Sequence, residues 1–428
     1  ALRGYANSDL SSSIVFSAGM NPGLYSYVEQ FEDFYPNATG EIKKKIILKV
    51  SDYRSAFIQG KFLAKKGLWV SEYRVESGLN CGGHAFATDG FLIGPILEEF
   101  KTNREELTRT VNELLKQALA DKSRVVPSAD MVVKISAQGG VGTAEEHQFL
   151  IDHYGVDSVG WGTPFLLVPE AVNIDEPTLE KLADATEKDL FLSDISPLGV
   201  PFNSLSGNTK DLEKLSNIVS GKPGSNCPKR NVALNHEFTQ RGICTASRQY
   251  QTLKLAELSN ENLPANEYKL RYDKIVDKSC ICVGLGTSAL LVNDLDTKVE
   301  GAGVSVCPGP NMAYFSRKMK LKEMIDHIYG RTNVITRSDR PNLFVKELQI
   351  YIDYIKNKIL ETKTIPSAGI GDKHQKYFTT FIKNLENGID YYSEMFSKAK
   401  ENFKEKRDSI TKELKIGKIT LAKLKKEV

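Results

Sequence analysis

The sequence predicts an α/β protein of the (β/α)8 TIM-barrel type, in which parallel strands alternate with helices. Two observations lead to this prediction. Short apolar runs alternate with stretches of helical spacing over residues 1–170, and repeated β-α units of that kind form parallel sheets. The last two runs, at 131–136 and 158–163, end in or lead into glycine-rich loops, which is typical of strands that hold a phosphate at one end of a barrel.

The individual elements follow from the same patterns. Helical spacing predicts helices at 24–34, 53–66, 96–119 and 144–153. Strands are expected at 14–19, 45–50, 68–73, 131–136 and 158–163. Five strands do not close an eight-stranded barrel, and the chain starts at Ala1 without an initiator Met. We therefore expect that the first strands lie in upstream sequence that has been lost, that a partner chain supplies them, or that the sheet is open.

Three regions are predicted along the chain. Residues 1–205 form the incomplete barrel, 206–338 an irregular cysteine-rich module, and 339–428 a basic helical tail. From residue 341 onward there are 18 Lys and Arg against 12 Asp and Glu, so the tail carries +6 while the whole chain carries +3. A basic helix with aromatic residues can bind nucleic acid or an acidic carrier. Because acidic residues are mixed in throughout, we favour amphipathic helices with buried aromatics and solvated lysines.

The overall composition is ordinary for a globular protein. Hydrophobic residues make up 41% and charged residues 26% of the chain. No apolar run has the length of a membrane span and the N-terminus has no signal-peptide pattern, so we expect a cytoplasmic protein that does not enter a membrane. Six cysteines in 428 residues do not indicate a secreted disulfide scaffold.

Glycines at the ends of the predicted strands indicate a cofactor site. Gly139 and Gly140 follow the fourth strand, and Gly162 lies at the end of the fifth. Backbone N–H groups of such loops approach phosphate closely, and the helix that starts at about residue 144 adds a favourable dipole. Gly82 and Gly83 close the third unit, where a flat ring can approach the backbone. His84 follows directly, and its near-neutral pKa suits a proton donor or base.

The order of these motifs resembles the later strands of the nitronate monooxygenase family, which includes the flavin-dependent enoyl-ACP reductases. The resemblance covers roughly residues 10–205 and rests on the runs at 14–19 and 46–50, Asn80-Cys81-Gly82-Gly83-His84, Ala137-Gln138-Gly139-Gly140-Val141 and Gly160-Trp161-Gly162-Thr163. Members of that family are TIM barrels that bind FMN. The resemblance implies that His84 is the active-site histidine. It also implies that the FMN phosphate contacts Gly139, Gly140, Gly162 and Thr163.

Two further side chains are assigned to the flavin by the same resemblance. Lys49 ends its strand, where it would face the ring and stabilise negative charge near N1 and O2. Its alternative is a solvated lysine at a strand end. Gln138 flanks the flavin site, as do Gly82 and Gly83. The family's early strands are not matched in this chain, and the family rarely has anything like the long segment after residue 205.

That segment contains a second candidate site. Five cysteines lie within 81 residues, at Cys227, Cys244, Cys280, Cys282 and Cys307. Cys227 and Cys307 each precede a proline, a frequent arrangement at iron–sulfur ligands, and four thiolates suffice for a [4Fe–4S] cluster. We expect Cys227, Cys244 and Cys307 as ligands, with Cys280 and Cys282 competing for the fourth place. Zinc is a weaker alternative, and buried free cysteines are another, because the spacing fits no standard pattern.

The leading functional hypothesis is a flavin-dependent oxidoreductase of nitronate monooxygenase type, with an iron–sulfur cluster that passes electrons to the flavin. Its substrate would be a small molecule or an acyl-carrier thioester, with a separate redox partner. One alternative is an accessory barrel subunit of a larger assembly, in which the chain forms a homo-oligomer or a partner completes the barrel. Another is a flavin-dependent RNA-modifying enzyme, although nucleic-acid binding is not favoured.

Overall fold

The chain folds into two compact units in the computed structural model, which describes residues 1–364, 371–399 and 401–428. Unit 1 comprises residues 1–79, 87–160 and 341–428, and unit 2 comprises 80–86 and 161–340. Together they make a mixed α/β protein, as the sequence predicts. Among the described residues, no helix has the length and apolar character needed to cross a membrane.

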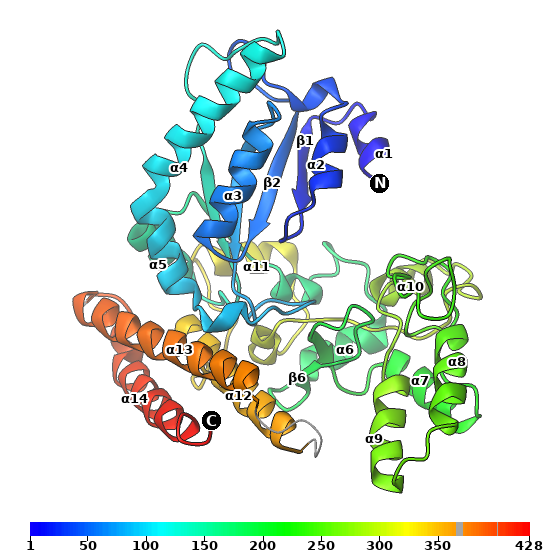
Figure 1. The fold of residues 1–428 in the computed structure, drawn as a ribbon. Coiled ribbons are helices and arrows are strands. Elements are labelled where there is room, and N and C mark those ends of the chain that lie inside the picture. Colours follow the sequence, from blue (N-terminus) through cyan, green and yellow to red (C-terminus); the bar gives the residue numbers. More distant parts are fainter. Residues whose placement is uncertain (365–370, 400) are drawn as a thin grey trace. The chain divides into compact units, whose positions relative to one another are not determined.

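A five-stranded parallel sheet forms the centre of unit 1 (Figure 1). The strands stand side by side in chain order, which agrees with the predicted succession of β-α units. In the described residues β1 and β5 are the outer strands of this sheet, so a closed barrel stays a prediction. The strands are β1 (Ser12–Phe16), β2 (Lys44–Val50), β3 (Val70–Glu76), β4 (Lys134–Gln138) and β5 (Ser158–Gly160).

Several helices that follow strands of unit 1 begin at polar caps. Asp52 accepts a hydrogen bond from the Ser55 amide at the start of α3 (2.7 Å), and Thr143 caps α5 in the same way. Gly155 ends α5 with a φ of +67°, a conformation that suits glycine. The helices are α1 (Leu2–Ala6), α2 (Pro22–Val28), η1 (Glu32–Phe34), α3 (Tyr53–Ala64), η2 (Thr88–Gly90), α4 (Ile93–Asp121) and α5 (Ala144–Tyr154).

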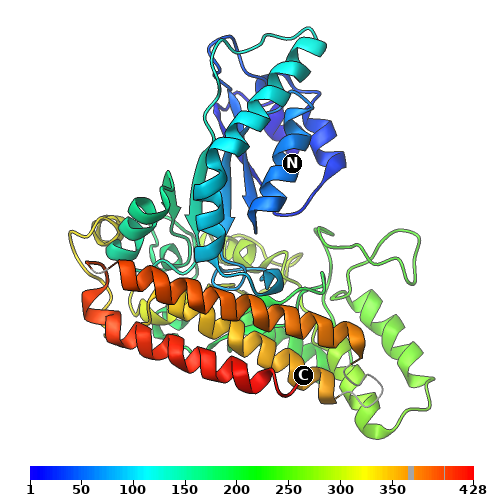
Figure 2. The same ribbon diagram turned by 60° about the vertical axis from the view of Figure 1, so that its left-hand side comes forward.

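The C-terminal helices belong to unit 1 and do not form a separate unit. They are α12 (Leu343–Thr364), α13 (Asp372–Lys398), η5 (Lys404–Lys406) and α14 (Arg407–Leu424), and the three long helices lie side by side (Figure 2). Six of the tail aromatics are buried, as predicted: Tyr351, Phe378, Phe381, Tyr392, Phe396 and Phe403. The Tyr392 hydroxyl donates a hydrogen bond to Glu347 and accepts one from the Gly94 amide, both within unit 1.

Unit 2 contains little β-structure in its described residues, and it has its own hydrophobic core. Its elements are η3 (Thr163–Leu167), α6 (Glu176–Asp184), β6 (Leu190–Ser193), β7 (Phe202–Leu205), α7 (Thr209–Val219), α8 (Arg248–Ser259), α9 (Ala265–Val276), α10 (Gly284–Val292), η4 (Pro310–Tyr314) and α11 (Leu321–Ile328). Strands β6 and β7 form an antiparallel pair. The core packs η3 and α6 against η4 and α11, with Leu167, Leu182, Met312 and Phe315 at its centre. The irregularity predicted for this part of the sequence reflects its many loops.

Candidate functional site

The residues assigned to the flavin fall in both units. Unit 1 contains Lys49, Gln138, Gly139 and Gly140, and unit 2 contains Gly82, Gly83, His84, Gly162 and Thr163. The five cysteines assigned to a metal centre all belong to unit 2. The predicted flavin residues are therefore divided between the two units, and the predicted metal ligands lie within unit 2.

In unit 1, the predicted residues share the carboxyl edge of the sheet. Gln138 is the last residue of β4 and pairs in register with Glu76 of β3 and Gly160 of β5. Gly160 leaves little space, because a Cβ there would lie 3.1 Å from the Gln138 side chain, which would have to shift slightly. Lys49 and Gln138 both lie near the carboxyl ends of their strands, which run parallel in this sheet.

Lys49 is held by a carboxylate at this edge. Its Nζ lies 2.7 Å from Glu76 Oε2, and both side chains are only partly exposed. The ion pair links the carboxyl ends of β2 and β3 and orients the ammonium group. Lys49 is therefore more than a solvated lysine at a strand end, although its charge is already shared with a carboxylate.

The loop between β4 and α5 has the backbone that the sequence predicts. Gly139 and Gly140 have φ of +130° and +72°, which side-chain-bearing residues rarely adopt. The eleven-residue helix α5 begins directly afterwards. One amide near its N-terminus is already taken, because Gly142 N donates to Glu146 Oε2 at 2.9 Å. The loop geometry fits a bound phosphate, and Glu146 competes with an anion for this end of the helix.

In unit 2, three segments meet at a tight junction, which we call the glycine junction and define as Gly82, Gly83, Thr163, Cys307 and Gly309. Gly83 N donates to Cys307 O at 3.0 Å, and Gly309 N donates to Thr163 Oγ1 at 2.9 Å. A Cβ on Gly82 would lie 2.6 Å from the Cys307 carbonyl oxygen, so only glycine fits without movement. The structure thus brings Thr163 together with the Gly82-Gly83 pair, as the predicted site requires.

His84 extends from this junction along β7. Its Nε2 lies 2.8 Å from Ser196 Oγ, and its ring meets the Phe202 ring edge-on at 4.9 Å between centroids. Asn203 fixes the neighbouring backbone, because its amide N donates to Gly83 O at 2.9 Å. An oriented, half-buried imidazole whose Nε2 lies on a hydroxyl is suited to act as a proton donor or acceptor.

Ser196, Phe202 and Asn203 were not singled out from the sequence. They lie in the irregular stretch around 196–203, where no periodic pattern points to a site. The only available signal is the adjacency of Ser196 to Pro197 and Gly199, which predicts a turn but not its contact with His84.

Four of the five cysteines assigned to a metal centre lie together. The Cys282 thiol donates a hydrogen bond to Cys280, which lowers the pKa of Cys280 and raises that of Cys282. Burial raises the pKa of Cys244 to about 11, and the neighbouring sulfurs of Cys227 and Cys280 act in the same direction. Cys282 also interacts with Cys244 and Cys227, so electrostatic interactions link these four residues. We call these four residues, Cys227, Cys244, Cys280 and Cys282, the thiol cluster.

Cys307 is the exception among the predicted ligands. It belongs to the glycine junction, where burial raises the pKa of its thiol and the Gly83 backbone opposes this. The structure therefore groups Cys280 and Cys282 with Cys227 and Cys244, and it places Cys307 with the His84 segment. Within the described ranges, no three or more His, Cys, Asp or Glu side chains are arranged so that they could hold a metal ion.

A buried carboxyl group in unit 1 was also missed by sequence reasoning. Glu347 of α12 is fully buried and accepts hydrogen bonds from Ser77 Oγ (2.5 Å), the Ile93 amide (3.0 Å) and Tyr392 Oη (3.1 Å). Burial raises its pKa to about 7, and the three donors oppose the rise. Its position on the apolar face of a helix, beside Phe344 and Leu348, was the available signal.

No protein-family model matches the chain, and no curated protein matches it significantly.

Proposed function

We propose that this protein is an FMN-dependent oxidoreductase of the nitronate monooxygenase and enoyl reductase type, built on a (β/α)8 barrel to which the five parallel strands belong. The observation that carries the proposal is the carboxyl edge of the sheet. There the glycine loop follows Gln138 at the end of β4, and Lys49 lies near the end of β2, which supports a site for a phosphate-bearing flavin. The glycine junction with His84 supports it independently.

Each residue has a role in this proposal. Bound FMN would accept or deliver a hydride or single electrons at its N5. In unit 1, Gly139 and Gly140 bind phosphate through the backbone and Lys49 stabilises negative charge on the ring. In unit 2, Gly162 and Thr163 are the second pair assigned to phosphate, and His84 gives or takes the substrate proton while Ser196 fixes its ring.

The two half-reactions test this proposal without a known electron donor. Flavin-loaded protein is mixed anaerobically with an alkyl nitronate, or is first reduced with dithionite and then mixed with an enoyl thioester. We expect bleaching of the flavin in the first case or its reoxidation in the second, and loss of that reaction in His84→Ala. A flavin-loaded protein in which neither mixture changes the spectrum would contradict the proposed activity.

An iron–sulfur cluster is the second cofactor of the proposal, with zinc as the weaker alternative. The thiol cluster supports it through the chemistry of its donors, since four sulfurs lie within interaction range of one another. A cluster passes single electrons to a flavin, which accepts one or two. A small-molecule or acyl-carrier substrate, a redox partner and a cytoplasmic location belong to the same proposal.

An accessory subunit is the second candidate, and one observation favours it. A cavity of about 970 Å³ lies along the sheet and is lined by strand residues such as Ser13, Lys45, Ile47, Ser71 and Lys134. On β2, the lining residues Lys45 and Ile47 alternate with the buried Ile46 and Leu48. A partner chain that completes the barrel would cover this face. Size-exclusion chromatography with mass measurement tests this, and a monomer at all working concentrations would contradict it.

The RNA-modifying alternative has less support. The tail aromatics that could stack on bases include several that are buried, such as Phe381 and Tyr392. The alternative then depends on the basic charge of the tail, which makes binding strongly dependent on salt. RNA retention that is absent at low salt would contradict it.

A further inference from the structure

The thiol cluster is assembled from three segments that hydrogen bonds tie together. Ser225 N donates to Ala246 O at 3.2 Å and Arg248 N donates to Ser225 O at 3.0 Å, which forms a parallel bridge between 225 and 247. Cys227 and Cys244 lie two and three residues from this bridge. On its far side, the Arg230 guanidinium donates to Gly242 O at 2.6 Å. The loops that carry these two cysteines are therefore clamped at both sides.

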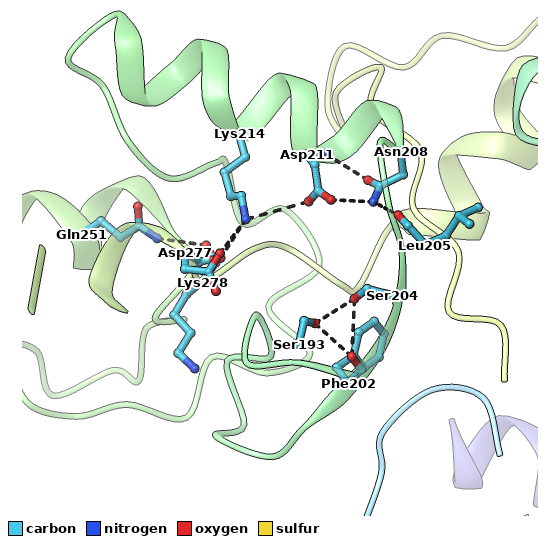
Figure 3. A network of polar contacts seen from close by, with 10 residues as sticks. All are labelled: Ser193, Phe202, Ser204, Leu205, Asn208, Asp211, Lys214, Gln251, Asp277 and Lys278. Atoms are coloured by element: carbon cyan, nitrogen blue, oxygen red, sulfur yellow. Dashed lines mark hydrogen bonds and ion pairs between the residues drawn. The ribbon is translucent and has the colours of Figure 1, made fainter. Parts of the chain in front are cut away.

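The third segment carries Cys280 and Cys282. Gln251 of α8 donates to Lys278 O at 3.0 Å, and Lys214 of α7 lies 2.9 Å from Asp277 Oδ1 (Figure 3). A small cavity is lined by members of all three segments, including Ser225, Ala246 and Cys280. The three loops thus face one another before any ligand is bound.

Backbone amides surround two of the sulfurs in these loops. The amides of Cys282 and Val283 lie at the Cys280 sulfur, and the Ala246 amide lies at the Cys244 sulfur. Both cysteines are buried. Hydrogen bonds to the sulfurs are one of the features that set the reduction potential of iron–sulfur clusters.

We propose that Cys227, Cys244, Cys280 and Cys282 are the four ligands of one iron–sulfur cluster, and that Cys307 takes no part in it. This ligand assignment depends on the proposed function for one point only, namely that the metal centre is an iron–sulfur cluster. Each iron of a [4Fe–4S] cluster takes one thiolate, so the four sulfurs need not converge on a single ion. Cys307 is excluded because its loop is bound to Gly83 in the glycine junction.

The first test is the metal content of single variants of the full chain, purified without oxygen. Iron, acid-labile sulfide, zinc and FMN are measured per chain for the wild type, for Ser variants of the four cysteines, and for Cys307→Ser as the matched control. We expect the Ser variant of each of the four cysteines to lose most of the iron and sulfide, while Cys307→Ser keeps both. Loss of iron in Cys307→Ser, or its retention in any of the four, would overturn the ligand set.

A second measurement uses the wild type alone and so does not depend on the folding of variants. Cysteines are alkylated under native conditions before and after iron is removed with a chelator, and each peptide is identified by mass. The four cluster thiols should become reactive only after chelation, with Cys307 unchanged. A protein without iron and sulfide after anaerobic reconstitution overturns the proposal, as does stoichiometric zinc on the same four thiols. FMN content reports the flavin proposal separately.

Discussion

Units 1 and 2 bury ionisable groups in opposite ways. In unit 1, Glu347 accepts three hydrogen bonds from neutral donors, and burial outweighs them and raises its pKa to about 7. In unit 2, Cys280 accepts bonds from the Cys282 thiol and from two amides, and its pKa is lowered. The first arrangement favours a neutral acid that joins helices, and the second favours a thiolate that can bind iron.

The loss of His84 is expected to have the largest effect, and it isolates the chemistry of unit 2. In flavin-loaded His84→Ala we expect the rate of the active half-reaction to fall roughly 10²–10⁴-fold, because a positioned general acid or base contributes that much. Ser196→Ala, which only releases the ring, should cost less. Stopped-flow absorbance at equal FMN content measures both. Equal rates in His84→Ala and wild type would remove the histidine from catalysis.

The next effect concerns Glu347 and the stability of unit 1. A carboxyl group whose folded pKa is raised binds more protons when folded, so its contribution to stability falls as pH rises from about 4.5 to about 7. The difference is about 3 kcal/mol for an isolated group of this shift. Glu347→Gln should remove that part of the pH dependence.

The two tryptophans allow the pH dependence of stability to be measured in one unit at a time. Trp69 lies in unit 1 and Trp161 in unit 2. In Trp161→Phe, denaturant unfolding followed by fluorescence reports unit 1, and in Trp69→Phe it reports unit 2. The pH slope that Glu347→Gln removes should appear only in the first background. An equal change in both would contradict the assignment to unit 1.

A smaller effect is expected at the glycine junction. Gly82→Ala places a methyl group 2.6 Å from a backbone oxygen, so the backbone must move, at a cost of about 1–3 kcal/mol. Gly286→Ala is a matched control in helix α10, where a Cβ has no atom within 4 Å and alanine favours the helix by up to about 1 kcal/mol. Unfolding of the Trp69→Phe background compares them. Equal unfolding free energies of the two variants would mean that the glycine junction accommodates a Cβ at residue 82 without strain, against this prediction.

The smallest expected effect is that of the Lys49–Glu76 pair. Because both side chains are partly exposed, Glu76→Gln should change the unfolding free energy of unit 1 by less than about 1 kcal/mol. It should instead free Lys49 for the flavin and alter the FMN dissociation constant, which fluorescence titration measures. An unchanged constant in both Glu76→Gln and Lys49→Met would take Lys49 out of the flavin site.

The predictability of the two units from sequence also differs. The strands of unit 1 were predicted within about three residues because alternating burial and terminal glycines mark them. The run predicted at 158–163 is too long, since the strand ends at Gly160 and η3 starts at Thr163, directly before Pro164. Lys49 and Gln138 share an edge because parallel strands all end on the same side.

The contacts of unit 2 could not be predicted in the same way. Cys227 and Cys244 are 17 residues apart in irregular sequence, and the bridge between 225 and 247 that joins their loops follows no periodic pattern. The Cys-Pro pairs mark Cys227 and Cys307 alike, and sequence did not indicate that the Cys307 carbonyl oxygen accepts a hydrogen bond from the Gly83 amide. Side-chain contacts between loops depend on tertiary packing, which local propensity does not determine.

The most direct test of the account is the FMN content of the wild-type protein. The full chain is purified without oxygen, denatured, and the released cofactor is identified by mass and quantified against protein. The account predicts FMN in a stoichiometric amount, either as isolated or after incubation with added FMN. A protein that neither carries nor takes up FMN would contradict it, and the glycine loops would then be turns alone.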